Sequence, residues 1–385
     1  MGRTIPGRFS WVGTYAAAVI VFAFGASSPA SEPQAAASKA RIDFLKLCDL
    51  ASTEVNKETR RVHKRERRVP FYHDSYAVRA LAVAYDMTGK KAYLAGCKRW
   101  SDRMLAFQAK MTPEGAYYMN YGRKPGQNKG GWYVADSSSI AMGVLATAIR
   151  CPDSADRDRY LASVESFAKL VIDNYVGKSG GITDGLWDKY DGEWWCSSGL
   201  FGSLAFLLYE ETGNERYLKV ALGAVDWLNR LDFRQVKHIS FKEAAPAVVM
   251  YILEGYSARM PHLKPGTSRY QAACVQIDKT LEWMSDNQAG RGAAHQWDYN
   301  SQWGSKLGGL PFHMFVFARH IPKYSNIAGA ADQELRHITS VLSEDRKPIL
   351  SQLAVFAMMS YAEKLSPDAL YRSTKRTKSV TERID

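Results

Sequence analysis

Two ten-residue segments, YDMTGKKAYL at 85–94 and YEETGNERYL at 209–218, follow one pattern. Each segment ends an apolar run, passes through Thr-Gly, and resumes at Tyr-Leu. A glycine at this place suits the left-handed conformation that closes a helix, and the tyrosine and leucine begin the next apolar stripe. We therefore expect Thr88-Gly89 and Thr212-Gly213 to be turns between paired helices, not catalytic loops.

Looser copies of this pattern extend along the chain. Its tyrosines fall at 93, 160, 217 and 270, with spacings of 67, 57 and 53 residues. One long helical hairpin with its loop has this length, and such hairpins bury their apolar faces only by stacking on neighbours. Helical periodicity predicts further helices near 40–60, 75–85, 138–150, 158–174, 200–209, 221–231, 244–258, 270–287, 311–320, 331–343 and 348–364.

No run of alternating strand residues stands out. The sequence therefore predicts an all-α fold, an (α/α) toroid of five or six helical hairpins. An open solenoid is the competing arrangement.

The two ends of the chain differ in composition from the middle. Residues 1–30 combine Arg3 and Arg8, an uncharged run from Trp11 to Ala26, and the small residues around Ala30. This pattern is typical of a signal peptide and predicts a periplasmic or secreted protein. An uncleaved anchor is the alternative. We expect residues 39–365 to form the single toroid domain and 366–385 to be a disordered charged tail, with no membrane span in the mature chain.

Charge and cysteine content restrict the classes of partner. The formal net charge is +12, and residues 57–68 read KETRRVHKRERR. Without a nucleic-acid-binding motif, this balance favours an acidic oligosaccharide or polysaccharide over nucleic acid, although a solvated basic helix face would look the same. Five cysteines lack CxxC spacing, so we expect neither a zinc site nor a redox pair. No cofactor is predicted, and the oligomeric state stays open.

The loops between the predicted helices are rich in aromatic residues, especially 112–135, 177–199 and 290–311. In a helical toroid, such loops gather at one mouth, where binding and catalysis concentrate. The 177–199 loop also carries Asp184, Asp188, Asp191 and Glu193, but these lack the spacing of a calcium-binding EF-hand, so no metal is predicted. The side chains expected to bind a sugar are His73, Tyr121, Trp132, Trp194, Trp195, His295 and Trp297.

Two carboxylates stand where inner helices are expected to begin. Asp74 follows FYH and Asp136 follows WYVA, and an apolar helix comes after each. Because inner helices of a toroid start at the same mouth, the two side chains could converge as a general acid and its ionised partner, the pair that glycoside hydrolysis uses. The competing interpretation is that both are helix N-caps.

Three segments carry a resemblance to a known family. They are His73-Asp74 with the following AVRALAVAYDMTGKKAYL, Asp136 within WYVADSSSIAMGVL, and WCSSGLFGSLAFLLYEETGNERYL at 195–218. Over residues 70–230 the chain resembles the unsaturated glucuronyl and rhamnogalacturonyl hydrolases of the six-hairpin glycosidase superfamily. The resemblance implies that Asp136 is the general acid and base acting on an unsaturated uronic acid, that Asp74 holds the sugar, and that Trp195 lines the subsite. Cys196 and its neighbours replace the arginine that the family carries after this tryptophan.

Two other functions fit the same sequence. A polysaccharide lyase or uronyl epimerase would draw on Tyr121, Arg123, His295 and His313 for proton abstraction and charge neutralisation. A non-catalytic sugar-binding scaffold would need neither aspartate.

Overall fold

A computed structural model describes residues 32–58, 70–119, 132–185, 192–232, 245–289, 299 and 304–371. The predicted signal peptide at 1–30 lies outside these residues. So do most of the basic 57–68 segment and the predicted tail after residue 371.

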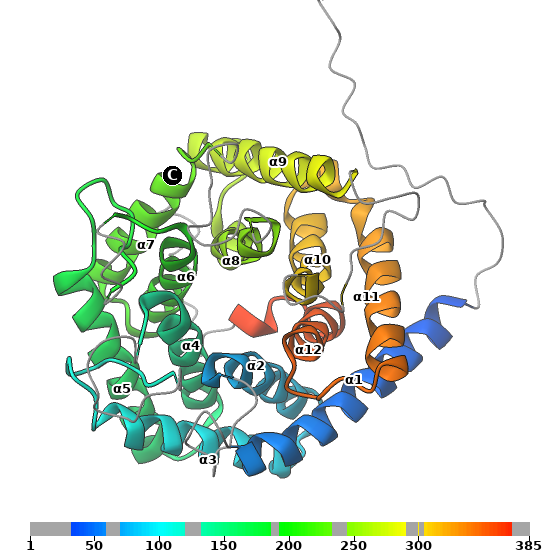
Figure 1. The fold of residues 1–385 in the computed structure, drawn as a ribbon, viewed down its shortest axis with the longest axis horizontal. Helices are drawn as coiled ribbons and strands as arrows, with labels where there is room; N and C mark the ends of the chain where they lie inside the picture. The colour runs from blue at the N-terminus through cyan, green and yellow to red at the C-terminus, as the bar shows by residue number, and fades with distance from the viewer. Residues whose placement is uncertain are drawn as a thin grey trace, which may run out of the picture.

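Twelve α-helices in the described residues alternate between an outer and an inner ring (Figure 1). The outer helices are α1 (Glu32–Glu58), α3 (Lys91–Gln108), α5 (Ser154–Asn174), α7 (Glu215–Leu228), α9 (Ser268–Ala289) and α11 (Ile327–Glu344). The inner helices are α2 (Phe71–Thr88), α4 (Val134–Arg150), α6 (Trp195–Thr212), α8 (Ala245–Arg259), α10 (Leu310–His320) and α12 (Gln352–Leu365). The all-α toroid is confirmed, with six hairpins.

The inner ring is closed. Each inner helix packs against the next one, and α12 packs against both α2 and α1, which excludes an open solenoid. The sequence supports this because inner helices are apolar on all sides: α6 is buried without interruption from Trp195 to Glu211. The outer helix α7 buries only one stripe, which includes Tyr217, Leu218 and Ala221. A helix apolar all round is stable only inside a core.

The two Thr-Gly turns have the same geometry, as the repeated sequence predicts. Gly89 and Gly213 adopt φ of 68° and 74°, and their amides donate to the carbonyls of Tyr85 and Tyr209 over 2.8 and 2.7 Å. The preceding threonine hydroxyl accepts from the amide two residues later over 3.2 Å in both copies. Each turn joins an inner helix to the next outer helix with two residues.

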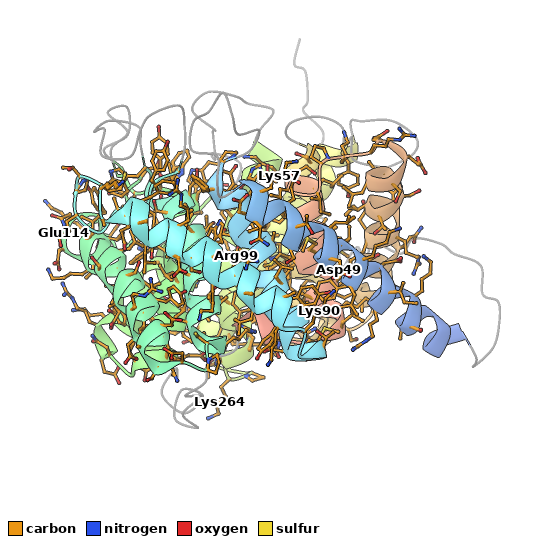
Figure 2. The ribbon with its side chains drawn as sticks, turned by 90° about the horizontal axis from the view of Figure 1, so that it is seen from below. Asp49, Lys57, Lys90, Arg99, Glu114 and Lys264 are labelled. Atoms are coloured by element: carbon orange, nitrogen blue, oxygen red, sulfur yellow. The ribbon has the colours of Figure 1, made fainter. Side chains whose placement is uncertain are left out.

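Three of the four repeated tyrosines connect consecutive outer helices, whereas Tyr270 of α9 donates to the His320 carbonyl at the end of the inner helix α10. Tyr93 of α3 donates to Asp49 of α1 over 2.7 Å, and Tyr160 of α5 donates to Asp102 of α3 over 2.7 Å. Tyr217 of α7 donates in the same way to Glu165 of α5 over 3.3 Å. Figure 2 shows the first of these contact regions from the side, where Asp49 and Lys90 lie together between α1 and α3. The repeat that predicted the hairpins therefore also holds neighbouring hairpins together.

An ion pair crosses the centre of the ring. Arg79 on α2 and Glu254 on α8, which are opposite helices in Figure 1, meet with Nη1 and Oε1 2.6 Å apart and are 1% and 3% exposed. Burial alone would lower the pKa of Arg79, but the charge and hydrogen bond of Glu254 outweigh it and raise that pKa. Tyr76 Oη donates to Glu254 as well, over 3.3 Å.

The segment after α12 completes this central layer. The η6 turn (Ala369–Tyr371) is buried, and the guanidinium carbon of Arg79 lies 5.6 Å from the centre of the Tyr371 ring. Arg150 of α4 donates to the Ala369 carbonyl over 2.8 Å. Residues 366–371, which the sequence assigned to a charged tail, therefore belong to the fold because apolar Ala369, Leu370 and Tyr371 fill the centre of the ring.

The inner helices all begin at the same end of the barrel, because the outer helices end there. Figure 2 shows Lys57, at the end of α1, at one rim and Lys264, between α8 and α9, at the opposite rim. We call the Lys57 end the mouth. The five cysteines are buried and unpaired. Among the described helices, none is long and apolar enough to cross a membrane.

We expect the Arg79→Met variant to lose about 3–5 kcal/mol of unfolding free energy, because Glu254 would remain buried without its cation. The Arg79→Met/Glu254→Leu double variant should lose less than the sum of the two single changes. Urea unfolding followed by circular dichroism measures all three values. Lys39→Ala, which removes the exposed Lys39–Asp43 pair on α1, is the control and should change stability little. If the double variant loses as much unfolding free energy as the two single variants together, the two residues do not stabilise each other, which would contradict the role of the Arg79–Glu254 ion pair.

Candidate active site

The start of α4 places Asp136 in the mouth without using it as a cap. The N-cap of α4 is Tyr133, with φ −141° and ψ 151°, and the N-cap of α2 is Pro70, with φ −65° and ψ 155°. Asp136 and Asp74 each lie within the first turn, so the N-cap interpretation of the two carboxylates is wrong. The helices begin three residues before Asp74 and two before Asp136, because apolar Phe71 and Val134 already pack in the core.

A folded loop brings a second carboxylate to the same place. Between α5 and α6, Val176 pairs with Ile182 and Thr183 pairs with Glu193, so the loop turns back on itself. The Asp184 carbonyl accepts from the amide of Val134 over 3.2 Å, which ties the loop to the first residue of α4. Asp184 therefore lies beside the helix turn that carries Asp136.

Asp184 is buried and carries a strongly shifted pKa. Its side chain is 5% exposed, and Ser197 at the start of α6 donates to Oδ1 over 2.9 Å. Burial raises the pKa of Asp184 to about 7, the Ser197 hydrogen bond lowers it, and the negative charge of Asp136 raises it. Asp184 thus holds its proton near neutral pH, in electrostatic contact with a second, half-buried carboxylate.

The opposite side of this pair is built from α6, α8, α12 and the η4 turn (Gly304–Gly309). Lys306 Nζ of η4 lies 5.4 Å from the ring centre of Tyr251 on α8, and Gln352 of α12 donates to Tyr251 Oη over 2.8 Å. Burial raises the pKa of the Tyr251 hydroxyl well above its usual value. Burial also lowers the pKa of Lys306, while Cys196 and Asp136 raise it.

Two glycines explain how α6 and α8 approach closely enough to build this side. A Cβ on Gly199 would lie 2.3 Å from the Tyr251 carbonyl oxygen, and a Cβ on Gly255 would lie 3.1 Å from the Gly199 Cα. The absence of both side chains lets the first turn of α6, with Cys196 and Ser197, pack directly on Tyr251. Helix packing therefore requires the glycine of the Cys-Ser-Ser-Gly sequence, which stands where the family resemblance predicted an arginine.

Asp74, in the first turn of α2, contacts the outer ring. Asp74 is fully buried, and the Trp100 indole of the outer helix α3 donates to its Oδ2 over 3.3 Å. Its carboxylate is therefore turned toward α3, away from the centre of the ring. Asp136 is in electrostatic contact with Asp184, and the convergence of Asp136 with Asp74 stays a prediction.

Of the seven residues predicted to bind sugar, four are buried and three lie outside the described residues. Trp132, Trp194 and Trp195 are all buried; Trp132 packs edge-on against Tyr175, and the two neighbouring tryptophans pack on each other with ring centres 4.9 Å apart. His73 is also buried and meets the Tyr72 ring edge-on. Tyr121, His295 and Trp297 lie outside the described residues. Their roles in sugar binding stay predictions.

Sequence reasoning considered Asp184 only as a loop carboxylate and did not single out Ser197, Tyr251 or Lys306. The sequence does carry one signal for Asp184, which is the glycine that follows it. Gly185 turns the loop with a positive φ of 90°, and a Cβ on Gly185 would lie 3.2 Å from the Trp132 ring. A carboxylate in a tight turn that packs on an aromatic residue is a candidate for burial.

The structure also bears on metal binding and on the lyase alternative. No group of three potential metal ligands occurs in the described part of the chain. Glu193 accepts from the Ser179 amide over 2.9 Å.

His313, a candidate base for a lyase, is buried with Nδ1 2.8 Å from Ser257 Oγ, and burial lowers the pKa of His313 to about 3. It therefore stays uncharged at neutral pH.

Comparison with known proteins gives the family. The model of glycosyl hydrolase family 76 matches residues 43–245, more than half of the chain. The chain belongs to glycosyl hydrolase family 76. The matched region includes Asp136, Asp184 and Ser197, whereas Tyr251 and Lys306 lie beyond it. Family 76 membership makes this chain a carbohydrate-active hydrolase, which confirms the glycosidase class predicted from the sequence.

Solved structures support the same fold. A glycoside hydrolase family 76 mannosidase from Bacteroides thetaiotaomicron superposes with a TM-score of 0.53 at 12% identity, covering 83% of this chain and 98% of its own. The Lin0763 protein from Listeria innocua gives 0.52 at 12% identity, covering 84% and 97%. No curated protein matches the sequence. The six-hairpin fold is thus confirmed, but the resemblance to unsaturated uronyl hydrolases is not, because the matching family is 76.

We expect Asp184→Asn to stabilise the protein at pH 8 and to have little effect at pH 4. The folded pKa of about 7 exceeds the unfolded value of 3.8, so the wild type loses stability as pH rises between these values. At about 1.4 kcal/mol per pKa unit, the full loss is up to about 4 kcal/mol. Asn keeps an oxygen for Ser197 and does not titrate.

Thermal unfolding at pH 4, 6 and 8 measures this effect. Asp158→Asn, on the exposed face of α5, is the matched control and should leave stability nearly unchanged throughout. A stability gain from Asp184→Asn that is equal at all three pH values would show that the charge of Asp184 is not its cause.

Proposed function

We propose that this protein is an exported glycoside hydrolase that cleaves mannosidic linkages, with Asp184 as the general acid and Asp136 as its ionised partner. The observation that carries the proposal is the burial of Asp184 beside Asp136, with the pKa of Asp184 raised to about 7. Two neighbouring carboxyl groups with different protonation states are what glycoside hydrolysis requires.

The chemistry assigns one step to each group. Asp184 donates its proton to the glycosidic oxygen as the bond from that oxygen to the anomeric carbon breaks. Asp136 acts at the anomeric carbon, either by taking a proton from the attacking water or by forming a bond that water then hydrolyses. The water supplies the hydroxyl of the new reducing end and a proton, which returns to the carboxylate pair.

Mannose as the substrate sugar is supported by family 76 membership together with the similar fold of a mannosidase in this family. If the substrate is instead the uronic-acid oligosaccharide expected from the sequence resemblance, the same assay should give a different result. Manno-oligosaccharides with α and with β linkages should therefore be incubated beside unsaturated uronic-acid oligosaccharides. Chromatography follows the first group, and loss of ultraviolet absorbance follows the second.

We expect release of mannose or shorter manno-oligosaccharides, and a fall of about 10²–10⁴-fold in kcat/KM for both Asp184→Asn and Asp136→Asn. Asp158→Asn on the outer surface should keep wild-type turnover. Cleavage of the uronic-acid substrates alone would overturn the mannosidase proposal. Unchanged turnover in Asp184→Asn would overturn its assignment as the acid.

The pH profile tests the role of Asp184 independently. A general acid must be protonated, so activity should fall as pH rises through about 7, the pKa of Asp184. Ser197 lowers that pKa through its hydrogen bond, so Ser197→Ala should move the alkaline limb of the kcat/KM profile to higher pH. A limb that moves to lower pH, or stays in place, would contradict the assignment.

Export is proposed from residues 1–30 alone, through the basic start, uncharged run and small residues described above. Cell fractionation followed by N-terminal sequencing of the purified protein tests it. We expect the mature chain outside the cytoplasm to begin shortly after Ala30. Recovery of a chain that retains residues 1–30 in the cytoplasmic fraction would contradict export.

A further inference from the structure

Arg259 is a buried cation whose guanidinium group makes no hydrogen bond within the part of the chain that the structure describes. It is the last residue of α8 and is 2% exposed, and its Nε, Nη1 and Nη2 atoms all lack a partner there. The nearby Tyr256 hydroxyl donates to Asn229 over 2.8 Å. Burial lowers the pKa of Arg259 to about 10, so the group is still charged at neutral pH. A buried charge without hydrogen bonds is strongly destabilising, which makes Arg259 a candidate for contact with a ligand.

The charged groups around Arg259 form a loose cluster between α7, α8 and α9, which are consecutive helices of the ring (Figure 1). Asp226 of α7 lies with Oδ1 3.9 Å from Arg259 Nη1 and with Oδ2 3.8 Å from Nη2 of Arg269 on α9. Both distances exceed the roughly 2.9 Å of a hydrogen bond. The side chains of Asp226 and Arg269 are 37% and 33% exposed, so the cluster reaches the protein surface. One carboxylate therefore faces two guanidinium groups without a hydrogen bond to either, and positive charge is in excess.

The equivalent junctions between other outer helices are closed by hydrogen bonds. Between α3 and α5, the arginine that precedes the repeat tyrosine, Arg159, donates to Asp102 over 2.6 Å. Between α5 and α7, the arginine at the same place, Arg216, donates to Asp173. Arg269 occupies this place at the start of α9, but its acidic neighbour is shared with a second, buried arginine. The junction of α7 and α9 thus departs from the repeat by adding a buried cation with unused donors.

The donors at this junction suit a phosphate group better than a carboxylate. The guanidinium of Arg259 offers a planar fork of N–H groups, the geometry that bonds oxyanions through two atoms at once. A carboxylate has two oxygens, and those of Asp226 reach neither arginine at hydrogen-bond distance. A phosphate group presents three acceptor oxygens in a tetrahedral arrangement. It can therefore bond the buried fork of Arg259 and the half-exposed guanidinium of Arg269 together, and its charge offsets the excess positive charge.

We propose that Arg259 and Arg269 form a binding site for a phosphate group at the outer wall of the ring, between α7 and α9. The partly exposed side chains of Arg269 and Asp226 turn toward solvent to admit the ligand, and Arg259 holds it from the inside. Arg259 follows Tyr251 by eight residues, about 12 Å along α8 away from the mouth. The site is therefore separate from the carboxylates at the mouth, and this inference does not depend on the proposed function.

Isothermal titration calorimetry of the whole protein with inorganic phosphate measures the binding, in a buffer whose ionic strength is kept constant with sodium chloride. We expect saturable binding that Arg259→Met and Arg269→Gln each weaken about tenfold or more, because each change removes charged hydrogen bonds to the anion. Arg269 is partly exposed, so Arg269→Gln keeps the test available should Arg259→Met fail to fold. Arg159→Gln removes the matched arginine between α3 and α5 and should leave the affinity unchanged.

The Asp226→Asn variant gives a prediction of opposite sign. Its carboxylate repels an incoming anion, so the affinity for phosphate should rise severalfold when the charge is removed. Weaker phosphate binding in Asp226→Asn would overturn the inference, and so would equal weakening in Arg159→Gln, which would indicate a general effect of charge.

A comparison of inorganic phosphate with a hexose 6-phosphate identifies the source of the phosphate group. Tighter binding of the sugar phosphate, lost in Arg259→Met, would support a phosphorylated sugar as the ligand. Equal or weaker binding of the sugar phosphate would support the free ion. Failure of both compounds to bind the wild-type protein would overturn the inference and leave the proposed function unaffected.

Discussion

The pairing of Arg79 with Glu254 is the interaction on which the rest of the ring depends. These residues are far apart in the chain and belong to inner helices on opposite sides of the barrel. Two buried charges are tolerable only when they meet each other, so their positions fix where α2 and α8 lie relative to one another. Tyr76 and Tyr371 then pack against the same arginine and fill the remaining space.

The ionisable groups at the mouth are arranged differently from those at the centre of the ring. The centre of the ring satisfies its charges within itself, whereas the mouth places a buried carboxyl group, Asp184, next to a second one. This arrangement costs stability at neutral pH, and a closed ring with a continuous apolar core can tolerate that cost. Such strain at a site supported by a rigid scaffold is typical of catalytic groups. The site is assembled from six segments, which are α4, the α5–α6 loop, α6, α8, α12 and η4, and they come together because the inner helices share one end.

Local sequence pattern predicted the paired helices, whereas the closure of the ring, with an open solenoid as the alternative, was settled by the contacts of α12 with α1 and α2. The Thr-Gly turns are determined by residues within one hairpin, so the pattern predicts them directly, whereas the bonds of the repeat tyrosines to the neighbouring hairpin appear only in the structure. The candidate site was predicted less well, because its geometry depends on residues distant in sequence. Asp136 was found from its place at a helix start. Asp184 was not, because only the packing of its loop on α4 makes it buried and brings it to Asp136. Lys306 has no local signal at all, since η4 reaches the site through contacts with α8 and α12.

The buried turn after α12 has a consequence for how the chain folds. Tyr371 packs against Arg79, a residue almost three hundred positions earlier, and α12 packs against α1 and α2. During synthesis, we therefore expect the inner face of the early hairpins to stay exposed until the last hairpin has left the ribosome. Contacts of such long sequence separation form slowly, and the unfinished ring remains open to aggregation in the meantime. We therefore expect the final inner helix and its trailing turn to be the last elements to join the ring.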